Sequence, residues 1–325
     1  MKYGITALLA CSLLLGMTGC MKYEKDANSH TTGTTTMVCD NTFENIMKQE
    51  IDVFEYQYPQ AHILARYGTQ REALDSLMSF KTKTIVIARD LTQKEKDFIK
   101  SKNHVVRSSK IAVDAVALIV NPANPVYKLT KKEISEILSG STRNWNDIEP
   151  NDLGEISVVF DDKASSLATY MRDSLLNGGQ FGPNVYAQGS VPTVFKAVME
   201  NKNAIGVLGV TWITSDMSSA DLSPEQLTEQ VLSDDPVVGA TLSDSVKVLS
   251  IYNDAEARAY KPYQEHIFNG TYPLFRQMFM ITTGTSGSLA SGFYAFVTGD
   301  IGQKIIMKTG ILPARATRIQ VVELK

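Results

Sequence analysis

Residues 111–125 carry the sequence IAVDAVALIVNPANP, a long apolar segment that ends in two closely spaced prolines. The apolar part, Ile111 to Val120, has the composition of a strand that is buried rather than exposed. Proline cannot continue a central strand, so Pro122 and Pro125 are expected to end it and to form a hinge. The chain on the two sides of this hinge is therefore expected to form separate lobes.

The chain before the hinge alternates between strands and helices. Short strands are expected at 37–39, 61–67 and 84–88, and apolar residues at helical spacing follow them. The run at 84–88, TIVIA, is typical of strands buried on both faces of a parallel sheet. Thr92 with Glu95 forms a capping box for the next helix. Three strand–helix units in succession predict an α/β lobe with a mostly parallel sheet.

The chain after the hinge repeats this alternation. Thr130 with Glu133 caps a predicted helix, and strands are expected at 156–160 and 204–208 with helices between them. The polar, acidic stretch 211–242 has only a weak helical stripe and receives no assignment. Further strands are expected at 246–251 and 272–282, and a helix at 289–306. Two α/β lobes joined by extended crossings leave a cleft, which is where ligands usually bind.

The chain begins with the order of a secretory signal peptide, residues 1–19. A positive charge comes first, an apolar run extends over 5–17, and Gly19 precedes Cys20. The apolar run is too short to span a bilayer comfortably. Gly19-Cys20 resembles the bacterial lipobox, although Met17 stands where that motif usually has Leu, and this resemblance predicts a lipidated Cys20. An ordinary secretory signal with a coincidental cysteine is the alternative.

Residues 20–36 are polar and rich in Thr, so they are expected to form a flexible tether between the lipid and the folded domain. Of the three cysteines, Cys11 leaves with the signal peptide and Cys20 takes the lipid. Cys39 is then alone, so the mature protein is expected to have no intramolecular disulfide. Its place in a strand predicts a buried, inert thiol.

The sequence contains no strong catalytic or metal-binding constellation. Its four histidines have neither the i, i+4 spacing nor the cysteine partners of a zinc site. Asp161-Asp162 is better explained as a solvated loop or a helix start than as an acid–base pair. The formal net charge of −3, without a basic stripe, disfavours nucleic acid as a partner. These observations give no support for an enzyme and imply no cofactor.

Three turns place hydroxyl groups and backbone N–H groups at predicted helix starts. They are Asp40 to Phe43, Ala164 to Ser166 and Tyr67 to Thr69, each between a strand and a helix. Helix N-termini present unsatisfied donors and the positive end of the helix dipole, which suits an oxoanion. Ordinary N-capping explains each turn by itself, but three such turns from two lobes weaken that explanation.

An ordered set of motifs resembles the phosphate-binding proteins of ABC importers over nearly all of the mature chain. The set consists of IAVDAVALIVNP at 111–122, LT at 129–130, EI at 133–134, NWND at 144–147, NAIG at 203–206, GTYPL at 270–274, GQ at 302–303 and GILP at 310–313. Each motif is weak alone, and their order carries the resemblance. It implies a type II periplasmic binding protein, with two α/β lobes joined by two crossing strands and a ligand cleft between them.

The resemblance also implies how the chain is divided. The first lobe is built from both ends of the chain, with boundaries expected at 37–118 and 250–325, and the second lobe spans 119–249. In this arrangement Asp114 and Trp145 are hinge and packing residues rather than ligand contacts.

The phosphate contacts of the family carry over to four residues whose motifs match. Thr42 and Phe43 stand where the family uses a Thr hydroxyl and the following backbone N–H group. Thr69 stands where the family uses a Ser. Ser165 matches the first residue of the Ser-Gly-Thr motif of the family. The resemblance therefore implies that these four residues contact the ligand.

The sequence also departs from the family pattern. Ser166 and Leu167 replace the Gly and Thr of the motif, so one side-chain donor is missing. Asp161 stands where the family has Arg, and Arg89 aligns best with its acidic residue. We therefore expect an ion pair with exchanged signs, in which Arg89 is the bidentate cation and Asp161 orients it or accepts a ligand proton. The alternative is an alignment shifted by one residue, with Arg89 a solvated charge beside Asp90.

The sequence thus predicts a monomeric, lipid-anchored periplasmic protein that captures an oxoanion. Phosphate is the first candidate, and the partner that receives it is the permease of an ABC importer. The alternative keeps the fold but changes the role, to an accessory or sensory lipoprotein that binds another small anion or a protein partner. Leu167 and Asp161 are the residues that favour this alternative.

Overall fold

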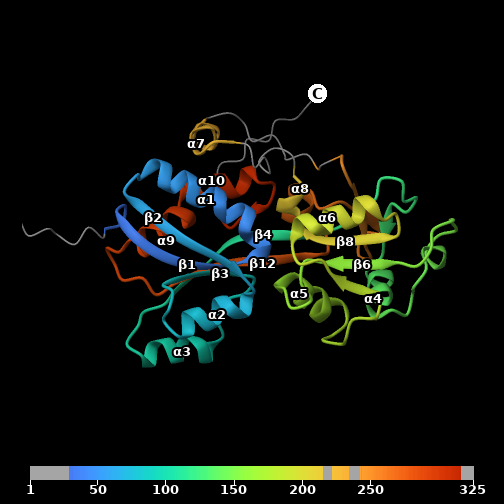
Figure 1. Cartoon of the computed structure of the whole chain (residues 1–325), viewed down its shortest axis with the longest axis horizontal. Helices are drawn as coiled ribbons and strands as arrows, with labels where there is room; N and C mark the ends of the chain where they lie inside the picture. Colours follow the sequence, from blue (N-terminus) through green and yellow to red (C-terminus); the bar gives the residue numbers. More distant parts are fainter. Residues whose placement is uncertain (1–28, 215–221, 234–241, 243, 316–325) are drawn as a thin grey trace, which may run out of the picture.

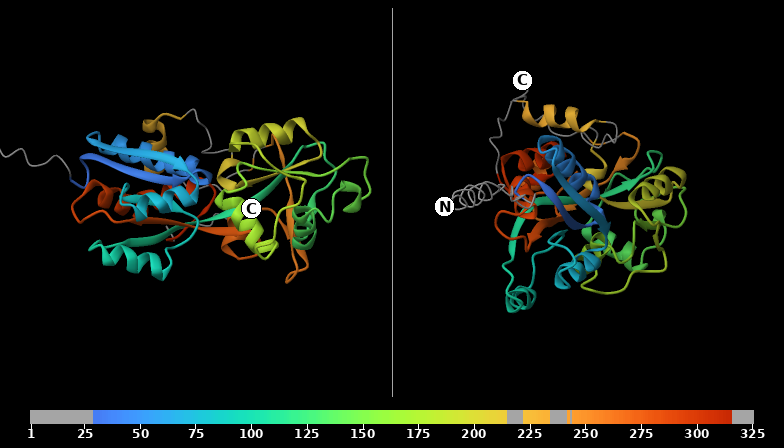
Figure 2. Two further views of the ribbon diagram at one scale, coloured as in Figure 1. Left: turned by 60° about the horizontal axis from the view of Figure 1, so that its bottom comes forward. Right: turned by 60° about the vertical axis from the view of Figure 1, so that its left-hand side comes forward.

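Strand β4 (Arg107–Val120) runs through the middle of the molecule and belongs to both of its lobes (Figure 1). The computed structural model describes residues 29–214, 222–233, 242 and 244–315. The two lobes lie side by side in Figure 1 and in the left view of Figure 2. Each lobe is an α/β unit, as the alternating pattern predicted.

The first lobe combines elements from both ends of the described chain. They are β1 (Gly33–Asp40), η1 (Asn41–Phe43), α1 (Glu44–Gln57), β2 (Ala61–Gly68), α2 (Gln70–Met78), β3 (Thr84–Ile87), α3 (Gln93–Ser101), β12 (Phe275–Thr282), α9 (Leu289–Thr298), α10 (Asp300–Lys308) and β13 (Leu312–Pro313). Strand β1 is parallel to β2 and β3, and β12 is antiparallel to β3. Helices α1, α9 and α10 lie on one side of these strands and α2 and α3 on the other (Figure 1). Because helices cover both faces, every residue of β3 is buried, and those after Thr84 are apolar.

The second lobe follows β4 along the chain. Its elements are β5 (Lys128–Leu129), α4 (Lys131–Ser139), η2 (Trp145–Asp147), β6 (Ser157–Phe160), α5 (Ser166–Leu175), β7 (Val185–Ala187), α6 (Val191–Glu200), β8 (Ala204–Gly209), η3 (Val210–Trp212), β9 (Lys247–Val248), β10 (Ser250–Asn253), β11 (Arg258–Tyr260) and α8 (Gln264–Phe268). Strand β6 is parallel to β7 and β8. Strands β5, β10 and β11 form a separate small sheet, so residues 250–260 lie with the second lobe, whereas the first lobe was expected to resume at 250.

The lobes share one sheet, with the strand order β2-β1-β3-β12-β4-β8-β6-β7. Strand β4 pairs with β12 as far as Ala115 and with β8 from Val116 onward. The chain returns beside this point, where Val116 donates its N–H to the carbonyl oxygen of Leu274 at 2.9 Å. Tyr272 donates its hydroxyl to the carbonyl oxygen of Val116 at 2.6 Å. The two crossings therefore lie next to each other, at the junction of the lobes.

The hinge expected at Pro122 and Pro125 is not at this junction. The pairing of β4 changes partner at Ala115 and Val116, so the prolines follow the end of β4 inside the second lobe. There Asn121 donates its side-chain N–H to the carbonyl oxygen of Met199 at 2.7 Å. The prediction was wrong because a proline shows where a strand ends, whereas the lobe boundary depends on which strands pair with β4.

Strand β1 begins earlier than expected. Gly33 to Thr36 pair in register with Ala61 to Leu64 of β2, so the tether predicted for 20–36 is wrong for its last four residues. β-branched Thr residues favour a strand when a partner strand is present, and composition alone could not show that partner. Residues 20–28 lie outside the described part of the chain.

Cys39 of β1 is buried, as predicted. Its thiol donates to the carbonyl oxygen of Asp40 at 3.2 Å, and burial raises the pKa of this thiol well above its ordinary value. A thiol that stays protonated is a poor nucleophile, so Cys39 is a core residue.

Helix α7 (Pro224–Leu232) packs on the first lobe, against α1 and α10. Leu227 and Val231 of α7 share an apolar cluster with Val53 of α1 and Ile305 of α10. This placement differs from the expected second lobe at 119–249, since the weak stripe of α7 finds its partners on the other lobe. Within the unassigned stretch 211–242, the structure thus has η3 and α7, and 215–221 and 234–241 lie outside the described residues.

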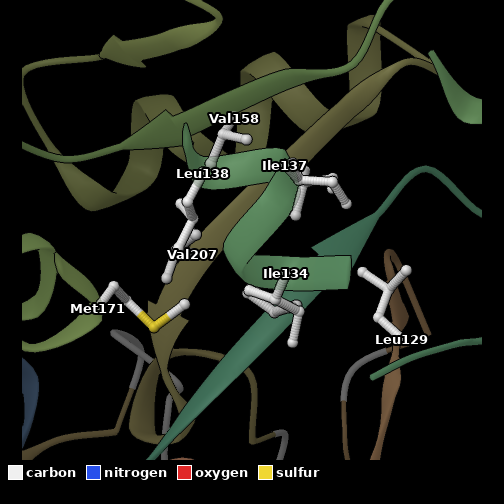
Figure 3. A pocket seen from close by; sticks show the side chains of 9 residues that line it. Leu129, Ile134, Ile137, Leu138, Val158, Met171 and Val207 are labelled. Carbon is white, nitrogen blue, oxygen red and sulfur yellow. The ribbon is translucent and has the colours of Figure 1, made fainter. Parts of the chain in front are cut away.

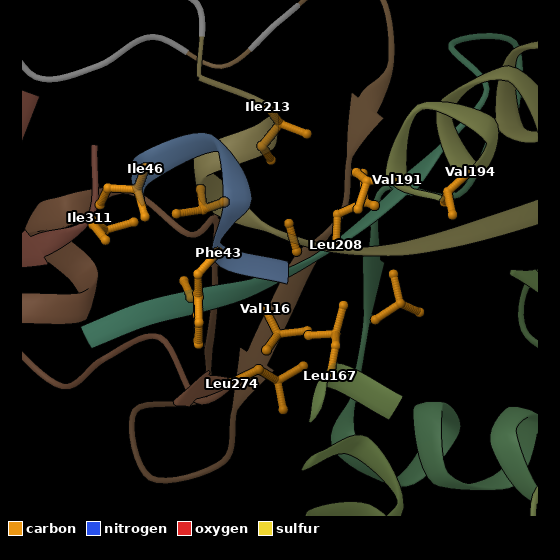
Figure 4. Close-up of a cluster of buried hydrophobic side chains, with 14 of the residues drawn as sticks. Phe43, Ile46, Val116, Leu167, Val191, Val194, Leu208, Ile213, Leu274 and Ile311 are labelled. Carbon is orange, nitrogen blue, oxygen red and sulfur yellow. The ribbon is translucent and has the colours of Figure 1, made fainter. Parts of the chain in front are cut away.

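One apolar cluster runs through both lobes. Phe43 of η1 and Leu167 of α5 lie in it beside Val116 of β4 (Figure 4). This apolar cluster packs beside the polar residues at the junction and excludes water from them. Among the described residues, no helix is long and apolar enough to cross a membrane.

A small cavity lies inside the second lobe, between α4, α5 and the strands (Figure 3). Its lining side chains are all apolar and include Leu129, Ile134, Ile137 and Met171. A cavity without polar groups offers an anion nothing to bind, so this space is a packing defect of the core and not a candidate site.

Candidate functional site between the two lobes

The first part of the site is the turn that follows β1. Oδ1 of Asp40 accepts hydrogen bonds from the backbone N–H and the hydroxyl of Thr42, at 3.0 and 2.7 Å. These local bonds turn the chain out of the strand into η1. Thr42 and Phe43 are both buried, so the Thr42 hydroxyl has a fixed orientation. The carboxyl end of a parallel strand is where ligands bind in open α/β sheets.

The second part is the start of α5, at the carboxyl end of β6. Ser165 caps this helix, because its hydroxyl oxygen accepts a hydrogen bond from the N–H of Ala168 at 3.2 Å. Ser166, the first helical residue, places its Oγ 3.2 Å from Oγ1 of Thr42. The structure therefore brings Thr42, Ser165 and Ser166 together from two lobes.

Helix η3 adds a further contact between the lobes. Asn45 donates its side-chain N–H to the carbonyl oxygen of Thr211 at 2.9 Å. The indole N–H of Trp212 donates to the carbonyl oxygen of Thr42 at 3.1 Å. Since η3 follows β8 directly, these bonds fix the end of a second-lobe strand to the turn after β1.

Arg276 of β12 is the cation of this site, and the sequence analysis missed it. Its Nε and Nη2 donate to Oδ2 of Asp114 at 3.1 and 3.0 Å, and its Nη1 donates to Oγ of Ser166 at 2.8 Å. The guanidinium carbon lies 4.3 Å from the ring centre of Phe43. Arg276 and Asp114 are both almost completely buried, so neither is screened by water. The sequence did contain a signal for this pair. Asp114 and Arg276 are opposite charges in two strands that were expected to be buried, and a buried charge requires a partner.

Asp161 lies at the carboxyl end of β6 with an exposed fraction of only 1%. Among the described residues, neither of its carboxylate oxygens has a well-oriented hydrogen bond. Burial is the main cause that raises the pKa of Asp161, the nearby N–H of Asp162 and hydroxyl of Ser165 lower it, Asp40 raises it further, and Arg276 lowers it. Asp161 is therefore a candidate acceptor for a proton carried by a ligand.

Other polar atoms near this point also lack partners within the described part of the chain. They include Oδ2 of Asp40, Oδ1 of Asn41 and Oγ1 of Thr211. All three residues belong to the turn after β1 or to η3, which the bonds of Asn45 and Trp212 hold together. Buried polar groups are usually satisfied, so this concentration of unused acceptors indicates a place for a ligand.

The expected ion pair between Arg89 and Asp161 is not present. Arg89 forms two hydrogen bonds with Glu95, from Nη1 to Oε2 at 2.9 Å and from Nη2 to Oε1 at 2.8 Å. Glu95 also accepts from the N–H of Thr92 at 2.7 Å, within the capping box of α3. The guanidinium of Arg89 is therefore engaged at the first turn of α3, which a comparison of motifs could not reveal.

Thr69 is likewise engaged in its own helix. Its hydroxyl accepts from the N–H of Glu72 at 3.2 Å and donates to Oε2 of Glu72 at 3.0 Å. Both interactions belong to the capping box of α2. For Thr69, N-capping thus accounts for the hydroxyl, while Thr42 and Ser166 have contacts across the lobes.

The donors and acceptors of the site define what it can bind. Arg276 and the first N–H groups of α5 are donors, which suit an anion. The Thr42 hydroxyl already donates to Asp40 and lies against the Ser166 hydroxyl, so these two hydroxyls would reorient to donate to a ligand. The Asp161 carboxylate and Oδ2 of Asp40 are acceptors, which suit a ligand that carries hydrogen. Within the described residues, no group of three or more His, Cys, Asp or Glu side chains could hold a metal ion.

Comparison with known proteins identifies the family of the chain. A family model described as a PBP superfamily domain matches residues 25–300. The phosphate-binding protein PstS of Pseudomonas aeruginosa is 22% identical over 304 residues, which cover 89% of this chain and 85% of that protein. PstS of Bacillus subtilis is 22% identical over 288 residues, covering 88% of this chain and 83% of the relative. The named relatives are binding proteins rather than enzymes, in agreement with the prediction.

Solved structures resemble the chain over most of its length. A phosphate ABC transporter substrate-binding protein from Clostridium perfringens, with bound phosphate, aligns with a TM-score of 0.67 and 19% identity, covering 87% of this chain and 100% of the other. An ABC-type phosphate transport receptor from Vibrio cholerae has a TM-score of 0.61 and 20% identity, with 86% and 100% coverage. The predicted fold class, a type II periplasmic binding protein, is thereby confirmed.

Proposed function

Because the chain belongs to the PBP superfamily, we propose that it is the substrate-binding protein of an ABC importer and that its ligand is a protonated oxoanion, with phosphate as the first candidate. The relatives named as phosphate-binding proteins support this ligand. Their similarity covers most of the chain and agrees with the resemblance that the ordered sequence motifs indicated.

One observation carries the proposal. Thr42 of the first lobe and Ser166 of the second meet at 3.2 Å, Arg276 bonds to Ser166, and neither carboxylate oxygen of the buried Asp161 has a well-oriented hydrogen bond among the described residues. Phosphate at neutral pH has oxygens that accept hydrogen bonds and an O–H group that donates one. Sulfate has no such donor, so Asp161 would distinguish between the two ions.

The burial of these residues determines how a ligand enters. Arg276 has an exposed fraction of 3% and Asp161 of 1%, so the lobes have to separate before an anion reaches them. A hydrogen bond that involves a charged group contributes about 1.5 to 3 kcal/mol. Several such bonds would offset the cost of ordering the lobes and the ligand. We propose that Thr42, Phe43, Asp161, Ser165 and Ser166 contact the anion.

Calorimetry on the purified full-length protein in mild detergent tests the proposal, with phosphate, sulfate and a small carboxylate as ligands. We expect phosphate to bind and sulfate to bind much more weakly. Thr42→Val and Ser165→Ala should each weaken binding by about 1 to 3 kcal/mol. Thr69→Val and Arg89→Ala are controls, because both side chains are engaged in capping boxes. Equal loss in a control would place Thr69 or Arg89 at the ligand, as the motif comparison first suggested.

The position of the protein in the cell is a second part of the proposal. We propose a periplasmic, monomeric protein that is attached to the membrane through a lipid on Cys20, which lies outside the described residues. The order of charge, apolar run and Gly19-Cys20 supports this. Cys20→Ser should release the protein from washed membranes with its fold intact. Retention of the variant in the membrane fraction would contradict the lipid anchor.

A second role has specific support in the carboxylates of the site. Asp114 bonds to Arg276, and the charges of Asp40 and Arg276 both act on the nearby Asp161, so this part of the described cluster holds three carboxylates and one guanidinium. If calorimetry detects none of the three anions, the accessory or sensory lipoprotein becomes the better proposal. In that role the protein would bind another small anion or a protein partner.

A further inference from the structure

We propose that Arg276, located on the crossing strand β12, is the residue that supplies the positive charge to the anion. This inference rests on the proposed function and identifies a specificity-determining residue of the same site. The motif comparison had placed the cation at Arg89, after the end of a strand. We place it instead at Arg276, at the junction of the lobes.

The hydrogen bonds of Arg276 leave part of the guanidinium available. A guanidinium has five N–H donors. Nε and Nη2 each use one on Asp114, and Nη1 uses one on Ser166. One hydrogen on Nη1 and one on Nη2 remain, and they belong to the two terminal nitrogens that bind an oxoanion as a fork.

The orientation of this fork is fixed before a ligand binds. Asp114 holds one edge of the guanidinium, and the ring of Phe43 covers a face at 4.3 Å from the central carbon. The edge that bears Nη1 lies against Ser166, whose Oγ is also 3.2 Å from the hydroxyl of Thr42. Arg276 is therefore directed toward the same hydroxyl groups that the proposed function assigns to the ligand.

The basic side chain that the sequence suggested is engaged elsewhere, because Arg89 is bonded to Glu95. Lys48 of α1 is paired with Glu44 at 2.9 Å. Arg276 is also the cation whose charge acts on Asp161. A site with unused carboxylate oxygens from two aspartates needs a cation to hold an anion, and Arg276 is placed to provide it.

A purely structural ion pair explains less. It would account for the two bonds between Arg276 and Asp114, which link the crossing strands β12 and β4. It does not account for the third bond, which reaches across to Ser166 at the start of α5. If Arg276 binds the anion, ligand binding acts directly on the strands that join the lobes.

Two variants separate the roles. Asp114→Asn removes the carboxylate charge and keeps the guanidinium, whereas Asp114→Asn combined with Arg276→Gln removes both charges. If Arg276 binds the anion, the first variant should bind phosphate at least as tightly as the unaltered protein, and the second about 10- to 100-fold more weakly. If the pair only braces the strands, both variants lose the same brace and should have the same affinity, which would overturn the inference.

Arg276→Lys provides a check that does not depend on the folding of the other variants. It keeps a positive charge beside Asp114 but loses the fork, so phosphate should bind about 10-fold more weakly while the unfolding temperature changes little. Unchanged affinity in this variant would overturn the inference and leave the proposed function intact. A lack of phosphate binding by the unaltered protein would overturn the proposed function, and with it the inference.

Discussion

Gly209 lies so close to Asp114 that a Cβ atom at Gly209 would stand 2.7 Å from Oδ2 of Asp114. The same Cβ would be 3.4 Å from Nη2 of Arg276. The last residue of β8 thus leaves the space in which the buried ion pair of the crossing strands forms. The φ angle of Gly209 is −73°, so the need for glycine is spatial and not conformational.

Gly209→Ala should therefore destabilise the protein, because a methyl group would displace a buried carboxylate. We expect a loss of about 1 to 3 kcal/mol in the free energy of unfolding, the usual cost of overpacking. Urea denaturation followed by circular dichroism measures it. Gly154→Ala is the matched control, since its Cβ would meet only the side-chain nitrogen of Asn203, at 3.1 Å. Equal stability of the two variants would contradict the tight fit at Asp114.

Glu50 of α1 should make stability depend on pH. It is completely buried, its carboxylate oxygens have no partner among the described residues, and burial raises its pKa well above the ordinary value. The unfolded chain releases this proton above a pH of about 4.3, whereas the folded protein keeps it. Stability is therefore lost as the pH rises from there toward the pKa of the folded protein.

Glu50→Gln should remove this dependence, because glutamine has a similar shape and does not ionise. We expect the variant to match the unaltered protein near pH 4 and to be more stable at pH 7. Urea denaturation across this range is the measurement, with the exposed Glu265→Gln as control. A variant that is less stable at pH 7 would show that ionised Glu50 has a stabilising partner.

The contact between Arg89 and Glu95 predicts that stability falls as the pH is lowered, which is the opposite of the pH dependence expected from Glu50. Hydrogen bonds from Arg89, followed by those from Thr92, lower the pKa of Glu95 to about 2. The stabilisation is present above the ordinary Glu pKa of about 4.3 and is lost as the pH falls toward 2. Arg89→Ala should reduce this loss of stability at acid pH. At pH 7 it should lower the free energy of unfolding by only about 0 to 1 kcal/mol, because the pair is partly exposed. Arg71→Ala, which removes only an exposed pair with Asp75, is the control.

The start of the folded domain can be tested by truncation. A chain that begins at residue 37 lacks the pairing of Gly33 to Thr36 with β2, and the bond from the Thr82 hydroxyl to the carbonyl oxygen of Thr36 at 2.9 Å. It should unfold at a lower temperature than a chain that begins at residue 29. Equal unfolding temperatures would restore the longer tether expected from composition.

Local patterns in the sequence were sufficient for most of the secondary structure. The capping boxes predicted at Thr92 and Thr130 are both present, since each involves only residues three positions apart. Residues 84–87 form a buried strand, as the β-branched residues indicated, and it is parallel to β1 but antiparallel to β12. The family resemblance added that the first lobe is built from both ends of the chain, which no local pattern contains.

By itself, the sequence determined the α/β character of both lobes, their helix starts, and the positions of Thr42, Ser165 and Ser166 between a strand and a helix. Only the tertiary structure decided that β4 crosses at Ala115, that Arg89 bonds to Glu95, and that Arg276 meets Asp114 and Ser166. The reason is physical: caps and strand propensities depend on neighbours in sequence, while a buried charge is stabilised by whichever group the fold brings to it. For Arg276 the groups that do this are 162 and 110 residues away in the chain.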